Sequence, residues 1–360
     1  MINVTKSFLP PFEEYTSILK RAWDNAWLTN NGELVLELEE KLKQFLGIPR
    51  LLFTGNGTVV LQMALKAFNI TKEVITTPFS YVATTNTILW EGCTPVFVDI
   101  DPEDFCIDAS KIEAAVTENT QAILATHVYG LPCNTEAIEQ VAKKHHLKII
   151  YDGAHAFGTT YLGKSLLSYG DISTCSFHAT KLFHTVEGGC ITCTDEGLLR
   201  KLMLMRSFGH VGDEYFNVGI NGKNSEFHAA MGLANLPHLE TIICRRKEIH
   251  YLYREQLANC DIKCLSYDKE KVTYNYAYFP VVFSSEKALL KVKKGLEENK
   301  INARRYFYPS LNKLPFLHKS NTCPVSENKA ARVLCLPLYP ELTDNEIFGI
   351  TNIIKKYLYA

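Results

Sequence analysis

The chain has 360 residues, of which 46% are hydrophobic and 21% charged, and its formal net charge is −1. A near-neutral chain lacks the excess of positive charge that is typical of nucleic-acid-binding proteins. No apolar run reaches the roughly 18 residues of a membrane helix. The first residues lack the apolar core of a signal peptide, and the eleven scattered cysteines are typical of reduced thiols. We therefore expect a cytoplasmic protein that binds neither nucleic acid nor membrane and holds no metal.

From residue 50 to about 205 the sequence alternates between short apolar runs and helical patterns. The predicted strands are 51–54, 74–77, 95–99, 122–128, 147–151, 173–177 and 189–194. The predicted helices are 57–68, 80–91, 109–116, 134–145 and 195–206. Several strands are continuous apolar runs, which is typical of a sheet covered on both faces. The pattern predicts an α/β domain with a mostly parallel seven-stranded sheet, whose ligands gather at the carboxyl ends of strands.

A helical stretch begins near residue 225, breaks at Pro237 and resumes as a long charged helix to about residue 258. A strand region at 274–283 and helical patterns at 285–298 and 343–358 follow. This part predicts a smaller C-terminal α+β domain. We place the large domain at residues 1–240 and the small domain at residues 241–360.

A glycine-containing turn follows the first of these strands and opens a helix. Glycines let the backbone approach an anion, and free N–H groups at a helix N-terminus bind phosphate. Gly57 and Thr58 are therefore candidate phosphate ligands. The alternative is a tight turn in which Thr58 caps the helix.

Two residues with complementary chemistry stand 29 positions apart. Asp152 ends a predicted strand, and Lys181 lies on the connection between the next two strands. Pyridoxal phosphate chemistry requires a lysine that forms a Schiff base and a carboxylate that pairs with the pyridinium nitrogen. Burial would lower the pKa of Lys181 and make it a competent amine nucleophile. His155 could reach the ring hydroxyl of such a cofactor, or it could be a core histidine.

Aromatic and cationic residues add further candidates. Tyr81 could stack on a planar cofactor, or it could pack in the core. Arg305 and Tyr308 lie in a segment of two cations and three aromatics. This segment could bind a sugar nucleotide, or it could be a solvent-exposed stretch that leads into a strand.

Two other motifs are rejected. The segment 158–165 matches the P-loop pattern, but no helix follows it directly, so it predicts a hairpin that turns at 162–164. The pair Cys190 and Cys193 matches C-x-x-C inside a predicted strand, without a second pair at zinc spacing.

Taken together, these motifs resemble those of the DegT/DnrJ/StrS sugar aminotransferases, a family of fold-type I pyridoxal phosphate enzymes. The resemblance covers nearly the whole chain and is weaker after about residue 245. It is carried by Leu28-Thr-Asn-Asn-Gly32, Gly55-Asn-Gly-Thr58, Thr77-Pro-Phe-Ser-Tyr81, Pro95-Val-Phe-Val-Asp-Ile-Asp101, His127-Val-Tyr-Gly130, Asp152-Gly-Ala-His155, Ser176-Phe-His-Ala-Thr-Lys181 and Glu187-Gly-Gly189.

The resemblance implies a role for each candidate around the cofactor, pyridoxal 5'-phosphate. Lys181 would carry the cofactor as a Schiff base and move protons during catalysis. Asp152 would pair with the pyridine nitrogen, His155 would lie near the ring hydroxyl, and Tyr81 would stack on the ring.

The phosphate group would be held by Gly57, Thr58 and Ser176. In this family an asparagine of the partner subunit also reaches the phosphate, and Asn221 is the candidate here. The resemblance thus implies a homodimer with shared active sites.

The implied activity is transfer of the amino group of L-glutamate to a nucleotide-linked keto-deoxy sugar. The motifs around Lys181 resemble those of enzymes that aminate C4 of the sugar, which favours dTDP-4-keto-6-deoxy-D-glucose as the substrate. The product of such a reaction would be used in the synthesis of O-antigen or another surface glycan. Alternatives are a 3-keto sugar or a UDP- or GDP-linked sugar. A pyridoxal-dependent sugar dehydratase would replace Lys181 by histidine, and a non-catalytic regulatory protein would not need the intact Lys181, Asp152 and Ser176.

Overall fold

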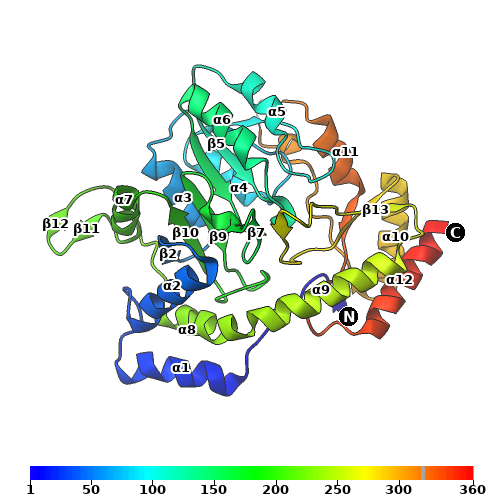
Figure 1. Cartoon of the computed structure of the whole chain (residues 1–360), viewed down its shortest axis with the longest axis horizontal. Helices are drawn as coiled ribbons and strands as arrows, with labels where there is room; N and C mark the ends of the chain where they lie inside the picture. Colours follow the sequence, from blue (N-terminus) through cyan, green and yellow to red (C-terminus); the bar gives the residue numbers. More distant parts are fainter. Residues whose placement is uncertain (318–320, 360) are drawn as a thin grey trace.

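The computed structural model describes residues 1–317 and 321–359. A seven-stranded sheet lies at its centre, in the order β2-β10-β9-β6-β5-β3-β4 (Figure 1). β10 runs antiparallel to both neighbours, and the other neighbouring pairs are parallel. The predicted mostly parallel, seven-stranded sheet is therefore confirmed. Its strands are β2 Leu51–Thr54, β3 Glu73–Thr76, β4 Thr94–Phe97, β5 Thr120–Thr126, β6 Lys148–Asp152, β9 Ile172–Ser176 and β10 Gly189–Cys193.

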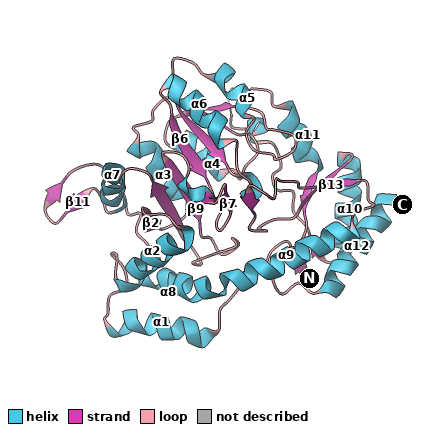
Figure 2. Cartoon of the chain, in the orientation of Figure 1, coloured by secondary structure: helices cyan, strands magenta, loops and turns pink. Residues whose placement is uncertain are grey.

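Helices cover both faces of this sheet, as Figure 2 shows. Ile150 of β6 packs in the layer that contains α3, whereas its neighbours Ile149 and Tyr151 pack in the layer that contains α6. Because side chains alternate between the two faces of a strand, burial of both faces requires a continuous apolar run. This explains why these strands do not show the apolar–polar alternation of a half-exposed sheet.

The helices of this region follow the prediction with two differences. They are α3 Gly57–Ala67, α4 Ala83–Trp90, α5 Ala109–Ile112, α6 Thr135–His145 and α7 Glu196–Arg206. α4 begins three residues later than predicted. α5 is a single turn, continued by a 3-10 turn at Glu113–Ala115, instead of a helix over 109–116.

A broken helix leads to the C-terminal part of the chain. α8 (Glu226–Asn235) ends in a 3-10 turn at Leu236–His238, and α9 (Leu239–Gln256) continues past it in nearly the same direction (Figure 1). The interruption lies at Pro237, where proline removes a backbone donor.

The C-terminal part contains a three-stranded sheet, β13-β15-β17, packed with helices. Its elements are β13 Ile262–Cys264, β15 Pro280–Phe283, α10 Glu286–Glu298, α11 Pro324–Arg332, β17 Val333–Cys335 and α12 Asp344–Tyr359. The strand predicted at 274–283 is confirmed only at 280–283. Asn275 donates instead to the carbonyls of His155 and Phe157, so this segment fastens the C-terminal part to the large sheet. The boundary at residues 240 and 241 stays a prediction.

Several elements have no counterpart in the prediction. They are β1 Ile2–Asn3, α1 Phe12–Asp24, α2 Glu33–Leu46, β11 His210–Val211, β12 Glu214–Tyr215, β14 Val272–Thr273 and β16 Ile301–Asn302, together with β13, α11 and β17 of the C-terminal part. The side chain of Glu226 accepts the backbone N–H groups of Leu34 and Val35 and so caps α2, whose own N-cap residue is a glycine.

The predicted hairpin at 158–165 is present as β7 (Thr160–Tyr161) and β8 (Lys164–Ser165), which pair antiparallel. No helix follows β8 directly except a 3-10 turn at Leu166–Ser168, so the P-loop reading is excluded. Within residues 1–317 and 321–359, no helix is both long and apolar enough to cross a membrane.

Candidate active site

One cavity of about 320 Å³ lies at the carboxyl edge of the large sheet. β6 ends there at Asp152, β9 ends at Ser176, and the turn after β2 brings Gly57 to the same edge. Parallel strands end on a common edge, so these residues meet although they are distant in the sequence. The cavity unites seven of the predicted residues, namely Gly57, Thr58, Tyr81, Asp152, His155, Ser176 and Lys181.

Lys181 lies on the loop between β9 and β10. The backbone of Phe177 closes this loop at both ends, because its N–H donates to Gly188 and its carbonyl accepts from Thr185. Burial lowers the pKa of the Lys181 amine, and the nearby carboxylate of Asp152 opposes this shift. The amine therefore loses its proton more readily than a surface lysine does.

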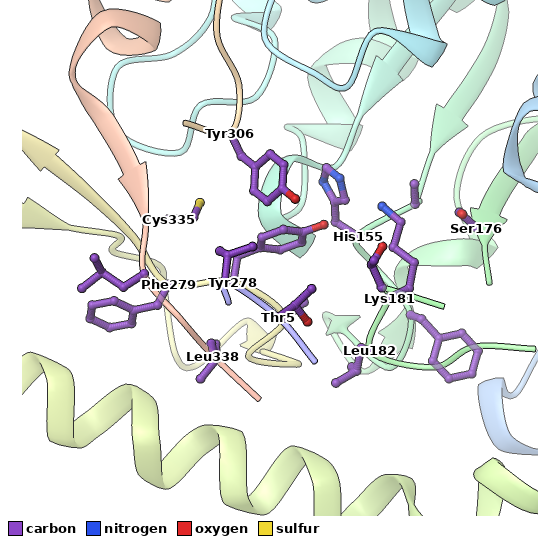
Figure 3. Close-up of a pocket in the computed structure, with 16 residues that line it drawn as sticks. Thr5, His155, Ser176, Lys181, Leu182, Tyr278, Phe279, Tyr306, Cys335 and Leu338 are labelled. Atoms are coloured by element: carbon purple, nitrogen blue, oxygen red, sulfur yellow. The ribbon is translucent and has the colours of Figure 1, made fainter. Parts of the chain in front are cut away.

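Lys181 and His155 also line a smaller cavity of about 40 Å³ (Figure 3). Val4 and Thr5 from the N-terminal segment form part of its wall. The hydroxyl of Ser7 donates to the carbonyl of Ala179 at 2.6 Å, so the N-terminal segment is fastened to the lysine loop. Residues near the N-terminus of the chain therefore cover one side of the lysine loop.

The carboxylate of Asp152 accepts one hydroxyl group and one backbone N–H group. Its Oδ2 accepts from the Thr84 hydroxyl at 2.7 Å, and its Oδ1 accepts from the N–H of Ala154 at 3.0 Å. Because Thr84 donates to the carboxylate, it accepts from Ser80 at 2.8 Å, and Ser80 accepts from Thr126 at 3.1 Å. This buried chain orients the carboxylate at the floor of the cavity.

His155 has a fixed proton position. Its Nδ1 accepts the backbone N–H of Tyr129 at 3.2 Å, so the ring proton is on Nε2. Burial and the charge of Lys181 hold the pKa of His155 well below its usual value. The ring stacks on Phe307 at 5.5 Å and meets the edge of Tyr278 at 4.9 Å. His155 is therefore a neutral hydrogen-bond donor at the cavity wall.

The N-terminus of α3 forms the opposite end of the cavity. Asn56, not Thr58, caps this helix, because its side chain accepts the N–H groups of Thr58 and Val59 at 2.9 Å. A Cβ atom at Gly57 would lie 2.7 Å from the Cβ of Ser176, so only glycine lets the helix approach that strand end. The hydroxyls of Thr58 and Ser176 thus meet at a helix N-terminus, which suits an anion.

Arg305 and Tyr308 do not line this cavity, and their assignment as substrate ligands stays a prediction. Arg305 pairs with Glu286 at 2.7 Å and donates to the carbonyl of Ala331 at 2.9 Å. Tyr308 stacks on its guanidinium, with 3.4 Å from the ring centre to Cζ. The neighbouring Arg304 lines the cavity instead.

Asn221 is exposed and also lies outside its own chain's cavity. The next residue, Gly222, accepts the N–H of Gly55 at 2.9 Å, so Asn221 stands beside the turn that opens α3. Its role toward a partner subunit stays a prediction.

The cavity is also lined by residues that the sequence analysis did not select as candidates. Tyr278 and Tyr306 come from the C-terminal part, and burial raises the pKa of both phenols. His178 and Glu187 face each other across the lysine loop at 3.5 Å. The sequence identifies His178 and Glu187 only as parts of the motifs around Lys181, and the tyrosines only as aromatics near predicted strands.

The cavity fits pyridoxal 5'-phosphate. It joins an anion site at α3, a buried carboxylate for a ring nitrogen, an exposed aromatic ring at Tyr81 and an amine of lowered pKa. Because Gly57 has no side chain, the backbone at the start of α3 comes close to Ser176 without a clash.

Comparison with known proteins agrees with this geometry. Residues 12–355 match the model of the DegT/DnrJ/EryC1/StrS aminotransferase family. A dTDP-4-amino-4,6-dideoxy-D-glucose transaminase of Shigella dysenteriae is 40% identical over 99% of this chain and 98% of its own length.

Solved structures share the fold over nearly the whole chain. A crystal structure of DesI, determined in the presence of its TDP-sugar product, is similar with a TM-score of 0.94 and 32% identity, over 99% of this chain and 92% of that one. Spr1654 from Streptococcus pneumoniae in its PLP form is similar with a TM-score of 0.89 and 25% identity, over 99% of each chain.

The hydrogen bond from Tyr129 predicts that His155 stays neutral, with its proton on Nε2, from pH 8 down to pH 5. An unperturbed histidine would take up a proton near pH 6.5, but burial and Lys181 disfavour the charged ring. ¹⁵N NMR of protein labelled at histidine, with His155→Gln to assign the signal, measures this directly. A titration midpoint near pH 6.5 would contradict the expectation.

Proposed function

The chain belongs to the DegT/DnrJ/EryC1/StrS aminotransferase family, and from this premise we propose that it moves the amino group of L-glutamate to C4 of dTDP-4-keto-6-deoxy-D-glucose. The enzyme is a sugar aminotransferase whose cofactor is pyridoxal 5'-phosphate. The observation that carries the proposal is the single cavity in which Lys181, Asp152 and the phosphate-binding turn meet.

The names of the relatives support this choice of sugar. The Shigella dysenteriae transaminase named for the dTDP-4-amino sugar aligns over the full chain, and DesI was crystallised with a TDP-sugar product. The product, dTDP-4-amino-4,6-dideoxy-D-glucose, would supply the synthesis of O-antigen or another surface glycan from the cytoplasm. A 3-keto sugar or a UDP- or GDP-linked sugar is the alternative substrate. An intact Lys181 disfavours a dehydratase or a regulatory protein.

The residues of the chain divide the chemistry between them. The cofactor, when bound, supplies an electron sink for negative charge on the carbon that carries the amine. Lys181 supplies an amine of lowered pKa, which can take a proton from that carbon and return it to a neighbouring atom. Asp152, oriented by the Thr84 hydroxyl, would hold the pyridine nitrogen of the cofactor and favour its protonated form. His155 donates from Nε2 and cannot compete for the proton that Lys181 moves.

We also propose a homodimer in which Asn221 completes the partner's site. Asn221 is exposed beside the turn that opens α3 but does not line its own cavity. The preceding hairpin, β11–β12, projects from the body of the chain (Figure 1). It and the residues that follow expose apolar side chains, with Tyr215 77% and Val218 90% exposed. Exposed apolar residues in one segment are typical of an interaction surface.

The activity is tested by its second half-reaction. Enzyme converted to the pyridoxamine form with L-glutamate and then desalted should recover the absorbance of the aldehyde form when dTDP-4-keto-6-deoxy-D-glucose is added. Lys181→Ala should slow this recovery by about 10²–10⁴-fold, because it lacks the group that moves the proton. If the wild type recovers only with 3-keto or UDP- or GDP-linked sugars, the C4 dTDP-sugar assignment is wrong.

The shared site is tested by mixing two weakened variants. Lys181→Ala and Asn221→Ala homodimers should each have low activity. Refolded together, they should form heterodimers with one site that holds both Lys181 and Asn221. Because random pairing makes half of the dimers mixed, activity should return to about a quarter of the wild-type level. No recovery, while wild-type protein refolds fully, would show that Asn221 acts within its own chain or not at all.

A further inference from the structure

Arg304 carries a positive charge at the cavity that nothing in the described chain neutralises. Its side chain lines the cavity and is exposed. Among residues 1–317 and 321–359, no carboxylate lies within 4 Å of its guanidinium, and no hydrogen bond engages it. The adjacent Arg305 differs, because it is paired with Glu286 and turned away from the cavity. Two neighbouring arginines thus have different environments.

Backbone hydrogen bonds fix the main chain of Arg304, although its guanidinium makes no ion pair or hydrogen bond among the described residues. Its N–H donates to the carbonyl of Cys335 at 3.1 Å, and its carbonyl accepts from the N–H of the same residue at 2.8 Å. The guanidinium lies over the ring of Tyr306, with 5.0 Å from Cζ to the ring centre. Tyr306 itself lines the cavity together with Lys181, and the charges of both Arg304 and Lys181 act on its pKa. Arg304 is therefore held at the cavity, on the side that Tyr306 forms.

Among the described residues that line the cavity, Arg304 is the cation, apart from Lys181, that no other group engages by an ion pair or hydrogen bond. In the proposed function, Lys181 holds the cofactor and Asp152 pairs with its ring nitrogen. Glu187 faces His178 at 3.5 Å. Both substrates of the proposed reaction are anions, since glutamate carries two carboxylates and a nucleotide sugar carries a diphosphate. They occupy the same cavity in turn, because one donates the amino group and the other receives it.

We propose that Arg304 binds the anionic group of the substrate, which is a carboxylate of glutamate, the diphosphate of the nucleotide sugar, or each in its turn. A guanidinium presents two parallel N–H donors that match either group. This inference rests on the proposed function and adds a residue that recognises its substrates.

The test compares Arg304→Gln with Arg304→Lys, which keeps the charge, and with Arg200→Gln, which removes an exposed arginine on α7 that does not line the cavity. Calorimetric titration of the holoenzyme uses two unreactive probes, glutarate for glutamate and dTDP for the nucleotide sugar. Arg304→Gln should weaken at least one of them by roughly 10- to 100-fold, the range for loss of a charged hydrogen bond. Arg304→Lys should retain part of the affinity, and Arg200→Gln should bind as the wild type does.

The two probes separate the sources of the anion. A loss confined to glutarate assigns Arg304 to a carboxylate, a loss confined to dTDP assigns it to the diphosphate, and a loss of both shows that the substrates share it. Unchanged binding of both probes would overturn the inference. The matching half-reactions, measured on the same variants, should show a raised apparent dissociation constant for the affected substrate with little change in the limiting rate.

Failure of the proposed function would look different. If the wild type aminated no dTDP-sugar, but its reaction with glutamate weakened in Arg304→Gln, the sugar assignment would fall and the role of Arg304 would stand. If both half-reactions proceeded equally well in wild type and variant, the role of Arg304 would fall and the function would stand.

Discussion

A chain of buried hydroxyl groups runs from Thr126 through Ser80 and Thr84 to Asp152. It joins the ends of two parallel strands, β5 and β6, to the segment that opens α4. Each hydroxyl donates once toward the carboxylate, so the orientation of Asp152 is set by the sheet itself and not by a mobile loop. The phosphate-binding turn and the lysine loop meet at the same edge because their strands end there. The cavity therefore forms where the carboxyl ends of the parallel strands meet, and the chain of hydroxyl groups holds Asp152 in place at its base.

Lys181 depends on this arrangement and on the N-terminal segment. An amine enclosed by protein is destabilised as a cation, and this lowers its pKa and frees its lone pair. Asp152 limits the shift, while Ser7 holds the loop through the carbonyl of Ala179. His155 adds a neutral donor instead of a second titrating group. The three residues thus have separate roles in the proposed reaction: His155 donates a hydrogen bond, Lys181 transfers a proton, and Asp152 pairs with a positive charge.

The sequence predicted the features that depend on periodicity, but it does not reveal the features that depend on where a side chain points. Continuous apolar runs located the strands, and the motifs at Asp152 and Lys181 identified residues that the structure brings together. Arg304 and Arg305 cannot be told apart by composition. Side chains alternate along an extended segment, and the bridge between Arg304 and Cys335 determines which one faces the cavity. The role of Thr84 was equally hidden, because a threonine inside a helical pattern gives no sign of a buried carboxylate 68 residues later.

The central claim is that Lys181 is the amine that carries the cofactor. Borohydride treatment of the holoenzyme fixes the cofactor permanently to the amine that holds it, and mass spectrometry of the digested protein then locates the modified lysine. The account predicts a phosphopyridoxyl group on the peptide that contains Lys181, and on no other lysine in stoichiometric amount. Modification of another lysine, such as Lys164 of the β7–β8 hairpin or Lys223 beside Asn221, would contradict it.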